Sequence, residues 1–363
     1  MKRGEIYFNR EVDFLTTETS QYVKMGIVQE ERKSEDRKKE HQTGNPREIT
    51  IETRIEDTPD ALGLESTLHN RFNARRIYGE WFLLDSQEIE NIKLVGLRLR
   101  DEQISNLPYY EKMEIANELL SNGLTRDASQ EEKVLAERAS QLTGGISILE
   151  ARKSITRSAL LQSIDLYTTE ITGILTIDKS KESTSFNKAK FIADHPEISQ
   201  QYQKVKPAKP STNYSATYKM TLNRISQEMQ EEVKALPKEL HDSRITNQAI
   251  DRRPELEVLH ANYLEYDREI EILRWELTFI EWKIKSSIEN YEKVVDLATW
   301  KRTLNPISSE LDVEAVKKHH PALYDAYMET KPGKWSVHIN PFRPYPINAF
   351  SLNEFYSECI ETV

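Results

Sequence analysis

Glu65 is the first residue whose position needs a chemical explanation. It lies in the stretch LESTLHNRF, where it borders the apolar stripe of a predicted helix. The apolar residues of this helix recur three to four positions apart, as on a buried face: Ala61, Leu64, Leu68 and Phe72. A helix that only packs against a core needs no carboxylate at this border. His69 lies one turn further on the same face, so the two side chains offer a cation ligand and a proton-transfer group.

Basic side chains form two clusters near this helix in the sequence. Arg32 and Lys38 belong to the stretch ERKSEDRKKEH, and Arg71, Arg75 and Arg76 follow Glu65. Such side chains can contact phosphates, although charge clusters of this kind are usually solvated helix faces. The chain has a net charge of −10, but residues 1–100 carry 17 basic and 19 acidic residues. Any phosphate contact here would therefore be local.

Short strands and helices are predicted to position these residues. Residues 4–9 (GEIYFN) and 21–28 (QYVKMGIV) are rich in Ile, Tyr and Val, and residues 47–57 (REITIETRIED) largely alternate apolar and polar positions, so we expect three strands. A charged helix ending at Gly44 lies between the second and third strands. The helix with Glu65 follows the third strand.

The rest of the chain is predicted to be mainly helical. From Ser86 to about residue 165 the pattern is amphipathic, with helix ends expected at Gly123 and at Gly144–Gly145. Residues 204–214 (KVKPAKPSTNY) have the composition of a linker or exposed loop. From Leu256 to Ile284 apolar residues repeat in steps of three and four, which is typical of a coiled-coil seam. A helical bundle, a helical hairpin and a dimer fit this seam equally well.

A weak internal repeat relates two parts of this region. Residues 186–202 align with residues 311–327 at a constant offset of 125, and the match includes His195-Pro196 with His320-Pro321. Paired histidine sites are one interpretation, but a proline at the first helical position, with histidine before it as the cap, is more economical.

We therefore expect an α+β N-terminal domain, a small antiparallel three-stranded sheet flanked by helices, followed by a mostly α-helical region with coiled-coil or helical-hairpin segments. The expected divisions are 1–93, the α+β domain; 94–203, a helical domain with the first repeat; 204–253, a linker and helix; and 254–363, a coiled-coil-like domain with the second repeat.

The first ninety residues resemble the GIY-YIG endonuclease superfamily, and most closely its phage and bacterial branch in which YIG is written KIG. The matching motifs occur in order: GEIY with Tyr7, YVKMG with Lys24, DRKKEHQTGNP with Arg37, LESTLHNRF with Glu65, and GEWF. Each motif is weak alone, but five in this order are fairly specific. The sequence departs from the family pattern in a longer stretch between the first two strands, an expanded loop before Arg37, and Val28 where Thr is common.

The resemblance implies a catalytic role for each matched residue. Glu65 would bind Mg²⁺ or Mn²⁺, and Arg37 would contact the non-bridging phosphate oxygens. Tyr7 would take a proton from the attacking water if its pKa fell below about 10, and Lys24 would be the cation that lowers it. His69 would donate a hydrogen bond that supports the metal ligand, or act as the acid for the leaving group. Equally, it would be a packing residue beneath the site.

These features predict a metal-dependent DNA endonuclease whose helical region positions DNA or forms a homo-oligomer. The alternative is a non-catalytic helical scaffold with a degenerate nuclease module that binds nucleic acid or a protein partner. No run of 18 apolar residues and no signal-peptide core occurs, so we expect a cytoplasmic protein without a membrane partner. The single Cys359 is consistent with a reducing compartment.

Overall fold

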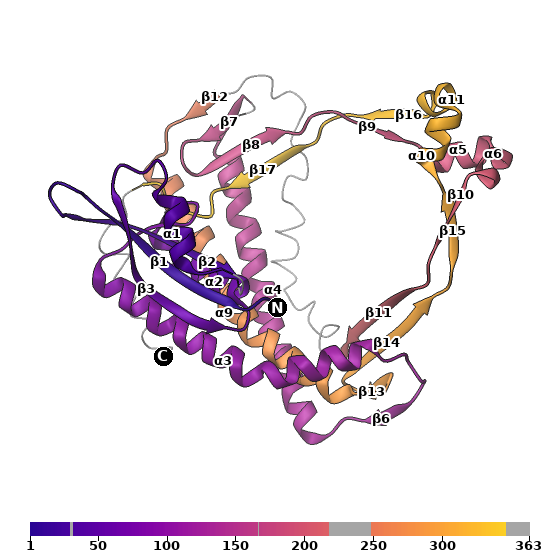
Figure 1. Cartoon of the computed structure of the whole chain (residues 1–363), viewed down its shortest axis with the longest axis horizontal. Coiled ribbons are helices and arrows are strands. Elements are labelled where there is room, and N and C mark those ends of the chain that lie inside the picture. Colours follow the sequence, from indigo (N-terminus) through magenta and orange to yellow (C-terminus); the bar gives the residue numbers. More distant parts are fainter. Residues whose placement is uncertain (30–31, 166, 218–247, 346–363) are drawn as a thin grey trace.

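The computed structural model describes residues 1–29, 32–165, 167–217 and 248–345. It has the expected α+β fold, with an N-terminal antiparallel sheet, flanking helices and a long helical region (Figure 1). No helix among these residues is both long and apolar enough to cross a membrane. The second half also contains many strands that the sequence analysis did not predict.

The N-terminal sheet has five strands in the order β3-β1-β2-β5-β4. Its elements are β1 (Gly4–Val12), β2 (Thr19–Gln29), α1 (Ser34–Gln42), β3 (Glu48–Thr58), α2 (Ala61–Arg71), a 3-10 turn (Asn73–Arg75), β4 (Arg76–Tyr78) and β5 (Trp81–Leu83). The three predicted strands are confirmed, and the stretch RIYGEWFL adds β4 and β5. One face packs on α2 and α3 through a core that includes Ile6, Phe8, Met25, Leu64 and Leu68. These side chains are fully buried, which fixes the register of the sheet.

Three long helices form the body behind the sheet: α3 (Ser86–Glu118), α4 (Gln130–Gln162) and α9 (Pro254–Ile288). α9 packs along α4 and also contacts α2 and α3, so its predicted apolar seam is covered within the same chain. The helix end expected at Gly144–Gly145 is wrong, because α4 continues through both glycines. A Cβ on Gly145 would lie 3.0 Å from Leu273 Cδ1, so the glycine serves close helix packing rather than termination.

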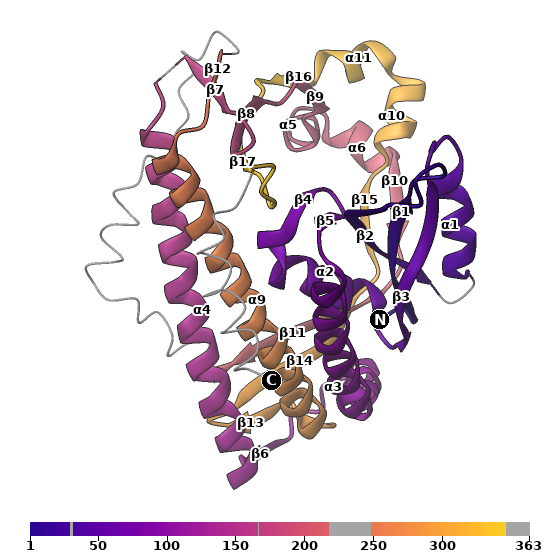
Figure 2. The same ribbon diagram turned by 90° about the vertical axis from the view of Figure 1, so that its left-hand side faces the viewer.

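Two long segments of the chain run side by side away from this body and return to it (Figures 1 and 2). We call residues 175–216 and 298–339 the paired arm. Its strands are β8 (Leu175–Lys179), β9 (Ser183–Phe186), β10 (Gln203–Lys206), β11 (Lys209–Ala216), β14 (Ala298–Asn305), β15 (Ser308–Leu311), β16 (Met328–Lys331) and β17 (Trp335–Ile339). They pair antiparallel as β8–β17, β9–β16, β10–β15 and β11–β14. The linker expected at residues 204–214 is therefore wrong, because this stretch forms β10 and β11.

Four short helices meet midway along the arm. They are α5 (Lys188–Asp194), α6 (Pro196–Gln201), α10 (Val313–His319) and α11 (Pro321–Ala326), and they share a small core around Phe191, Leu311 and Val316. Each end of the arm joins a small sheet, completed by β12 (Gln248–Ile250) and β7 (Thr168–Ile171) at one end and by β13 (Lys293–Val295) and β6 (Thr125–Asp127) at the other.

The internal repeat extends over almost all of these elements. β9, α5, α6 and β10 reappear 125 residues later as β15, α10, α11 and β16, with identical lengths. α4 and α9 also correspond, with lengths of 33 and 35 residues, and the parallel pair β6–β13 has its counterpart in β12–β7. The Gln203↔Leu311 pair corresponds to the Met328↔Phe186 pair, so the two copies exchange strands about a pseudo-twofold axis.

Candidate active site

Tyr7 and Lys24 lie on the face of the sheet opposite the core. Tyr7 pairs with Gly26 and Asn9 pairs with Lys24 across β1 and β2. Because side chains alternate along a strand, all four positions share one face. Tyr7 is fully buried, and a Cβ on Gly26 would lie 2.5 Å from its hydroxyl oxygen, so only glycine leaves room for the phenol. The Asn9 amide is also buried, with no hydrogen-bond partner among the described residues.

Helix α1 brings an imidazole onto this face. His41 Nε2 lies 3.2 Å from the Tyr7 hydroxyl oxygen and 3.1 Å from Lys24 Nζ. A lysine ammonium can only donate, so Nε2 of His41 is the acceptor and the ring proton lies on Nδ1. Arg37, one turn earlier on α1, is close enough to the phenol to lower its pKa. His41 was not predicted as a site residue. Its position four residues after Arg37 places both side chains on one face of α1, and this spacing could have indicated it.

The ionisation of Tyr7 differs from the expectation. Burial raises the pKa of the phenol, and the nearby Arg37 only partly opposes this rise. The expected fall in the Tyr7 pKa, with Lys24 as its cause, is therefore wrong. Compared with the Tyr7 phenol, the His41 side chain is better able to accept a proton. Burial, Lys24 and Arg37 all lower the pKa of His41, so the imidazole is neutral at pH 7 and its lone pair is available.

Glu65 reaches the same group of residues from α2. Its side chain is 9% exposed and makes no hydrogen bond or ion pair that the described part of the chain records. Burial raises its pKa to about 7, with a further contribution from Glu80, against the lowering effects of Arg76, Lys24 and Arg37. These electrostatic neighbours bring Tyr7, Lys24, Arg37 and Glu65 into one cluster.

Glu80 and Arg76 complete the cluster from the β4–β5 hairpin. Glu80 forms an ion pair of 3.3 Å with Lys24, and the Arg76 guanidinium donates to the Gly79 carbonyl. Burial lowers the pKa of Arg76, while Glu65 and Glu80 raise it. Arg76 was predicted as a phosphate contact and lies beside Glu65. Glu80 was not predicted, although it belongs to the GEWF motif.

His69 faces the sheet edge instead of the cluster of Tyr7 and His41. Its Nε2–H donates to the Met25 carbonyl at 3.1 Å, just beyond the point where β5 stops pairing with β2. Burial lowers the His69 pKa to about 4, and the ring packs against Phe82. This arrangement supports the packing role for His69 over the leaving-group acid.

The other predicted phosphate contacts lie at different depths. Arg32 is exposed and pairs with Glu40, and Lys38 is half-buried on α1. Arg75 pairs with Glu88, and Arg71 is only 9% exposed. Arg32 and Lys38 therefore have the greater access to a phosphate.

The donor set suits a hard divalent cation with few protein ligands. Glu65 supplies a carboxylate with no hydrogen bond or ion pair to any residue that the structure describes, and Glu80 is a second carboxylate close enough to raise its pKa. Among the described residues no group of three or more acidic, histidine or cysteine side chains could hold a metal ion. Mg²⁺ commonly keeps several waters and one or two carboxylates, so the residues present fit that ion.

Comparison with protein families supports the N-terminal assignment. Residues 11–95 match the T5orf172 domain, a nuclease-associated, GIY-YIG-like family from phage T5. The matched segment contains Lys24, Arg37, His41 and Glu65, and it begins after Tyr7. No curated protein and no solved structure matches the chain.

Proposed function

We propose that the protein is a metal-dependent DNA endonuclease that hydrolyses phosphodiester bonds through its N-terminal module. One observation carries the proposal: residues from four separate elements form one cluster, in which Tyr7 and Lys24 both reach the His41 imidazole and the charges of Arg37 and Glu65 act on the Tyr7 phenol. A structural role explains such a cluster poorly, because it buries an acid without a partner beside a second acid.

Proton transfer in this site would use Tyr7 and His41 together. The Tyr7 phenol donates toward Nε2 of the neutral His41, so it can pass its proton to the imidazole as it takes one from water. This path avoids a free phenolate, which the raised Tyr7 pKa disfavours. The Lys24 ammonium lies 3.1 Å from the same Nε2 and shares its single lone pair with the phenol, and both contacts require the ring proton to be on Nδ1.

Positive side chains would stabilise the charge that develops on the phosphate. Arg37 lies beside Tyr7 and donates one N–H to Glu40 at 2.8 Å, and its remaining N–H donors would contact the non-bridging oxygens. Arg76 and Lys24 act on the Glu65 carboxylate electrostatically and partly oppose the rise in its pKa. Glu65, with Glu80 nearby, would hold Mg²⁺ or Mn²⁺, which supplies Lewis acidity to the phosphate and the leaving oxygen.

A plasmid cleavage assay tests the proposal. Wild-type protein should convert supercoiled DNA to nicked or linear product with Mg²⁺ or Mn²⁺ and not with EDTA, and Glu65→Ala should abolish the conversion. Glu137→Ala, on an exposed position of α4, is the matched control and should cleave normally. Cleavage by Glu65→Ala at the wild-type rate would refute the proposal, and so would a wild-type protein inactive with both metals.

A further inference from the structure

The paired arm is a two-stranded ribbon with water on both faces. All four residues of β10 are exposed, as are three of four in both β9 and β16. A ribbon of this kind buries no core of its own and would be marginal alone. The small sheets at its two ends and the helical cluster midway hold it in place. Packing therefore does not explain the side chains along its surface.

Charge distinguishes the arm from the rest of the chain. Its two segments contain 13 basic and 9 acidic residues, whereas the whole chain has 50 and 60. The arm thus carries a charge of +4 and the remainder −14. Eleven of its lysines have exposed side chains, and they occur along both strands: Lys179, Lys181, Lys190, Lys204, Lys206, Lys209, Lys301, Lys317, Lys318, Lys331 and Lys334.

The lysines are densest where β10 pairs with β15. Glu310 is the partner of three of them, with nitrogen–oxygen distances of 3.3 Å to Lys188, 3.5 Å to Lys204 and 2.6 Å to Lys206. One carboxylate cannot neutralise three ammonium groups, so this face keeps a positive excess. Lys204 and Lys206 are two residues apart on one strand and therefore project from the same face.

We propose that the paired arm is a binding surface for duplex DNA, with these lysines contacting phosphates beside the major groove. This inference rests on the proposed nuclease function and names the element that holds its substrate. Adjacent strands lie about 4.8 Å apart, so a two-stranded ribbon can enter a major groove about 12 Å wide. At about 3.3 Å per residue, the stretch 203–216, which contains β10 and β11, extends about 45 Å. This length exceeds one turn of the duplex.

The apolar side chains of the arm favour a duplex over a single strand. Proteins that bind single strands without sequence preference stack bases on exposed aromatic rings. In the described arm the exposed large apolar residues are aliphatic: Ile192, Val205, Leu304 and Ile307. The surface therefore offers charge and aliphatic contact, which suit phosphates and thymine methyl groups.

Duplex binding should be measured in EDTA by fluorescence anisotropy over a range of salt concentrations, with a 30-bp oligonucleotide. The test variant is Lys204→Gln/Lys206→Gln/Lys209→Gln. The matched control is Lys112→Gln/Lys133→Gln/Lys293→Gln, three exposed lysines of the body. The arm variant should bind at least tenfold more weakly, and its slope of log K against log salt should be smaller by about 0.9 for each lost contact. The control should match wild type.

The inference is wrong if the arm variant keeps wild-type affinity and salt slope, if both variants lose affinity equally, or if only single-stranded DNA shows the difference. The variant Lys204→Arg/Lys206→Arg/Lys209→Arg keeps the positive charges and should bind duplex DNA like wild type. If this variant binds weakly while its circular dichroism spectrum is unchanged, the inference is also contradicted. The nuclease proposal can fail separately, because a protein that binds DNA through the arm but never cleaves it refutes only that proposal.

Discussion

The Glu65 carboxyl group is held in an environment that disfavours its charge. Burial and Glu80 raise its pKa to about 7, and the cations near it do not offset that rise. A residue kept only for packing would be replaced at little cost by Gln or Leu. Ionisable groups destabilised in this way occur mainly at functional sites, where a bound cation or substrate supplies the missing charge.

Glu65→Gln should stabilise the protein at alkaline pH and abolish cleavage. The folded pKa of Glu65 lies above its unfolded value, so its contribution to stability is greatest below about pH 4.5 and is lost as pH rises toward 7. At pH 8 in EDTA the variant should gain about 1–3 kcal/mol in the free energy of unfolding, and at pH 4 nearly nothing. Urea unfolding at both pH values measures this. An equal gain at both would exclude the ionisation mechanism.

His41→Ala should reduce the cleavage rate by about 10²–10⁴-fold, because it removes the acceptor for the Tyr7 proton. The control is His69→Ala, which should leave the rate of folded protein within a few-fold of wild type. It should instead lower the free energy of unfolding by about 1–3 kcal/mol, since the buried Met25 carbonyl loses its donor. Single-turnover cleavage and urea unfolding separate the two effects. If His69→Ala abolished cleavage and His41→Ala cleaved at nearly the wild-type rate, the roles assigned to these two histidines would be reversed.

Tyr7, Lys24, Arg37 and Glu65 could be proposed from sequence because each belongs to a short pattern in a fixed order, and their catalytic roles stay predictions. His41 and Glu80 were missed, since their roles arise from contacts between α1, β2 and the β4–β5 hairpin. The pKa of Tyr7 was predicted in the wrong direction because its burial depends on how closely α1 covers β1. Sequence gives residue types and spacing, while depth beneath a packed helix comes only from the fold.

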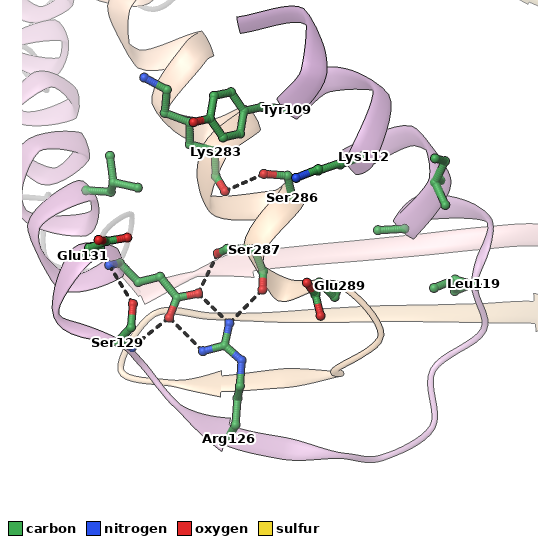
Figure 3. Close-up of a pocket in the computed structure, with 14 residues that line it drawn as sticks. Tyr109, Lys112, Leu119, Arg126, Ser129, Glu131, Lys283, Ser286, Ser287 and Glu289 are labelled. Carbon is green, nitrogen blue, oxygen red and sulfur yellow. Dashed lines mark hydrogen bonds and ion pairs between the residues drawn. The ribbon is translucent and has the colours of Figure 1, made fainter.

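At the scale of elements, an ion pair between β6 and α4 is linked by hydrogen bonds to the end of α9. Arg126 on β6 donates to the Glu132 carboxylate at 2.7 Å and to the Ser287 carbonyl at 2.8 Å. The Ser129 backbone and the Ser287 hydroxyl also donate to Glu132. Arg126, Ser129, Glu132 and Ser287 line a cavity of about 680 Å³. Figure 3 labels Arg126, Ser129 and Ser287 among its lining residues. Burial would raise the Glu132 pKa, but these donors outweigh it and lower the pKa to about 2.

Glu132→Gln should lower the free energy of unfolding at pH 7 by about 1.5–3 kcal/mol, because charged hydrogen bonds to Arg126 and Ser287 are lost. The folded pKa of Glu132 lies below its unfolded value, so its stabilisation is complete above about pH 4.5 and is lost as pH falls toward 2. Thermal unfolding of wild type and variant should therefore converge in acid. Glu131→Gln, on the exposed neighbouring position, should unfold like wild type throughout.

The long helices were easier to predict than the arm strands. α3 and α9 have strong three-to-four spacing, whereas β10 and β11 contain Lys and Pro and no alternating apolar face. That composition is normal for a strand exposed on both sides, but a loop has the same composition. The repeat predicted only helices here, but in the structure its second copy, from Ser308 to Lys331, has the same strands and helices as residues 183–206.

At the scale of the whole molecule, the segment 340–345 is one of the connections between the repeats and the N-terminal domain. This segment continues from β17, and the Arg343 N–H donates to the Arg76 carbonyl at 2.8 Å, next to the candidate active site. Phe342 packs edge-on against Tyr78. The paired arm thus ends on the same hairpin that presents Arg76 and Glu80 to Glu65. Through this segment, the position of the arm can influence the geometry of the site.

A buried histidine on α9 anchors that segment. His260 Nε2–H donates to the Asn340 carbonyl at 2.7 Å, and its Nδ1 accepts from the Tyr345 hydroxyl at 2.9 Å. Burial lowers the His260 pKa to about 4, so the ring is neutral at pH 7. Protonation at Nδ1 would remove the acceptor that Tyr345 uses. The anchor therefore stabilises the fold fully above about pH 6.5 and is lost as pH falls toward 4.

Tyr345→Phe should release the segment at neutral pH as acid releases it in wild type. The variant leaves Nδ1 of His260 buried without a donor, which should lower the free energy of unfolding by about 1–3 kcal/mol. Hydrogen exchange of the Arg343 amide should become faster, because its bond to Arg76 depends on the anchored segment. Tyr324→Phe, in the helical cluster of the arm, removes a hydroxyl far from this anchor along the chain and should change neither quantity. Unchanged Arg343 exchange in Tyr345→Phe would mean that the contact with Tyr78 alone holds the segment, and the arm would then be coupled to the site through that ring contact.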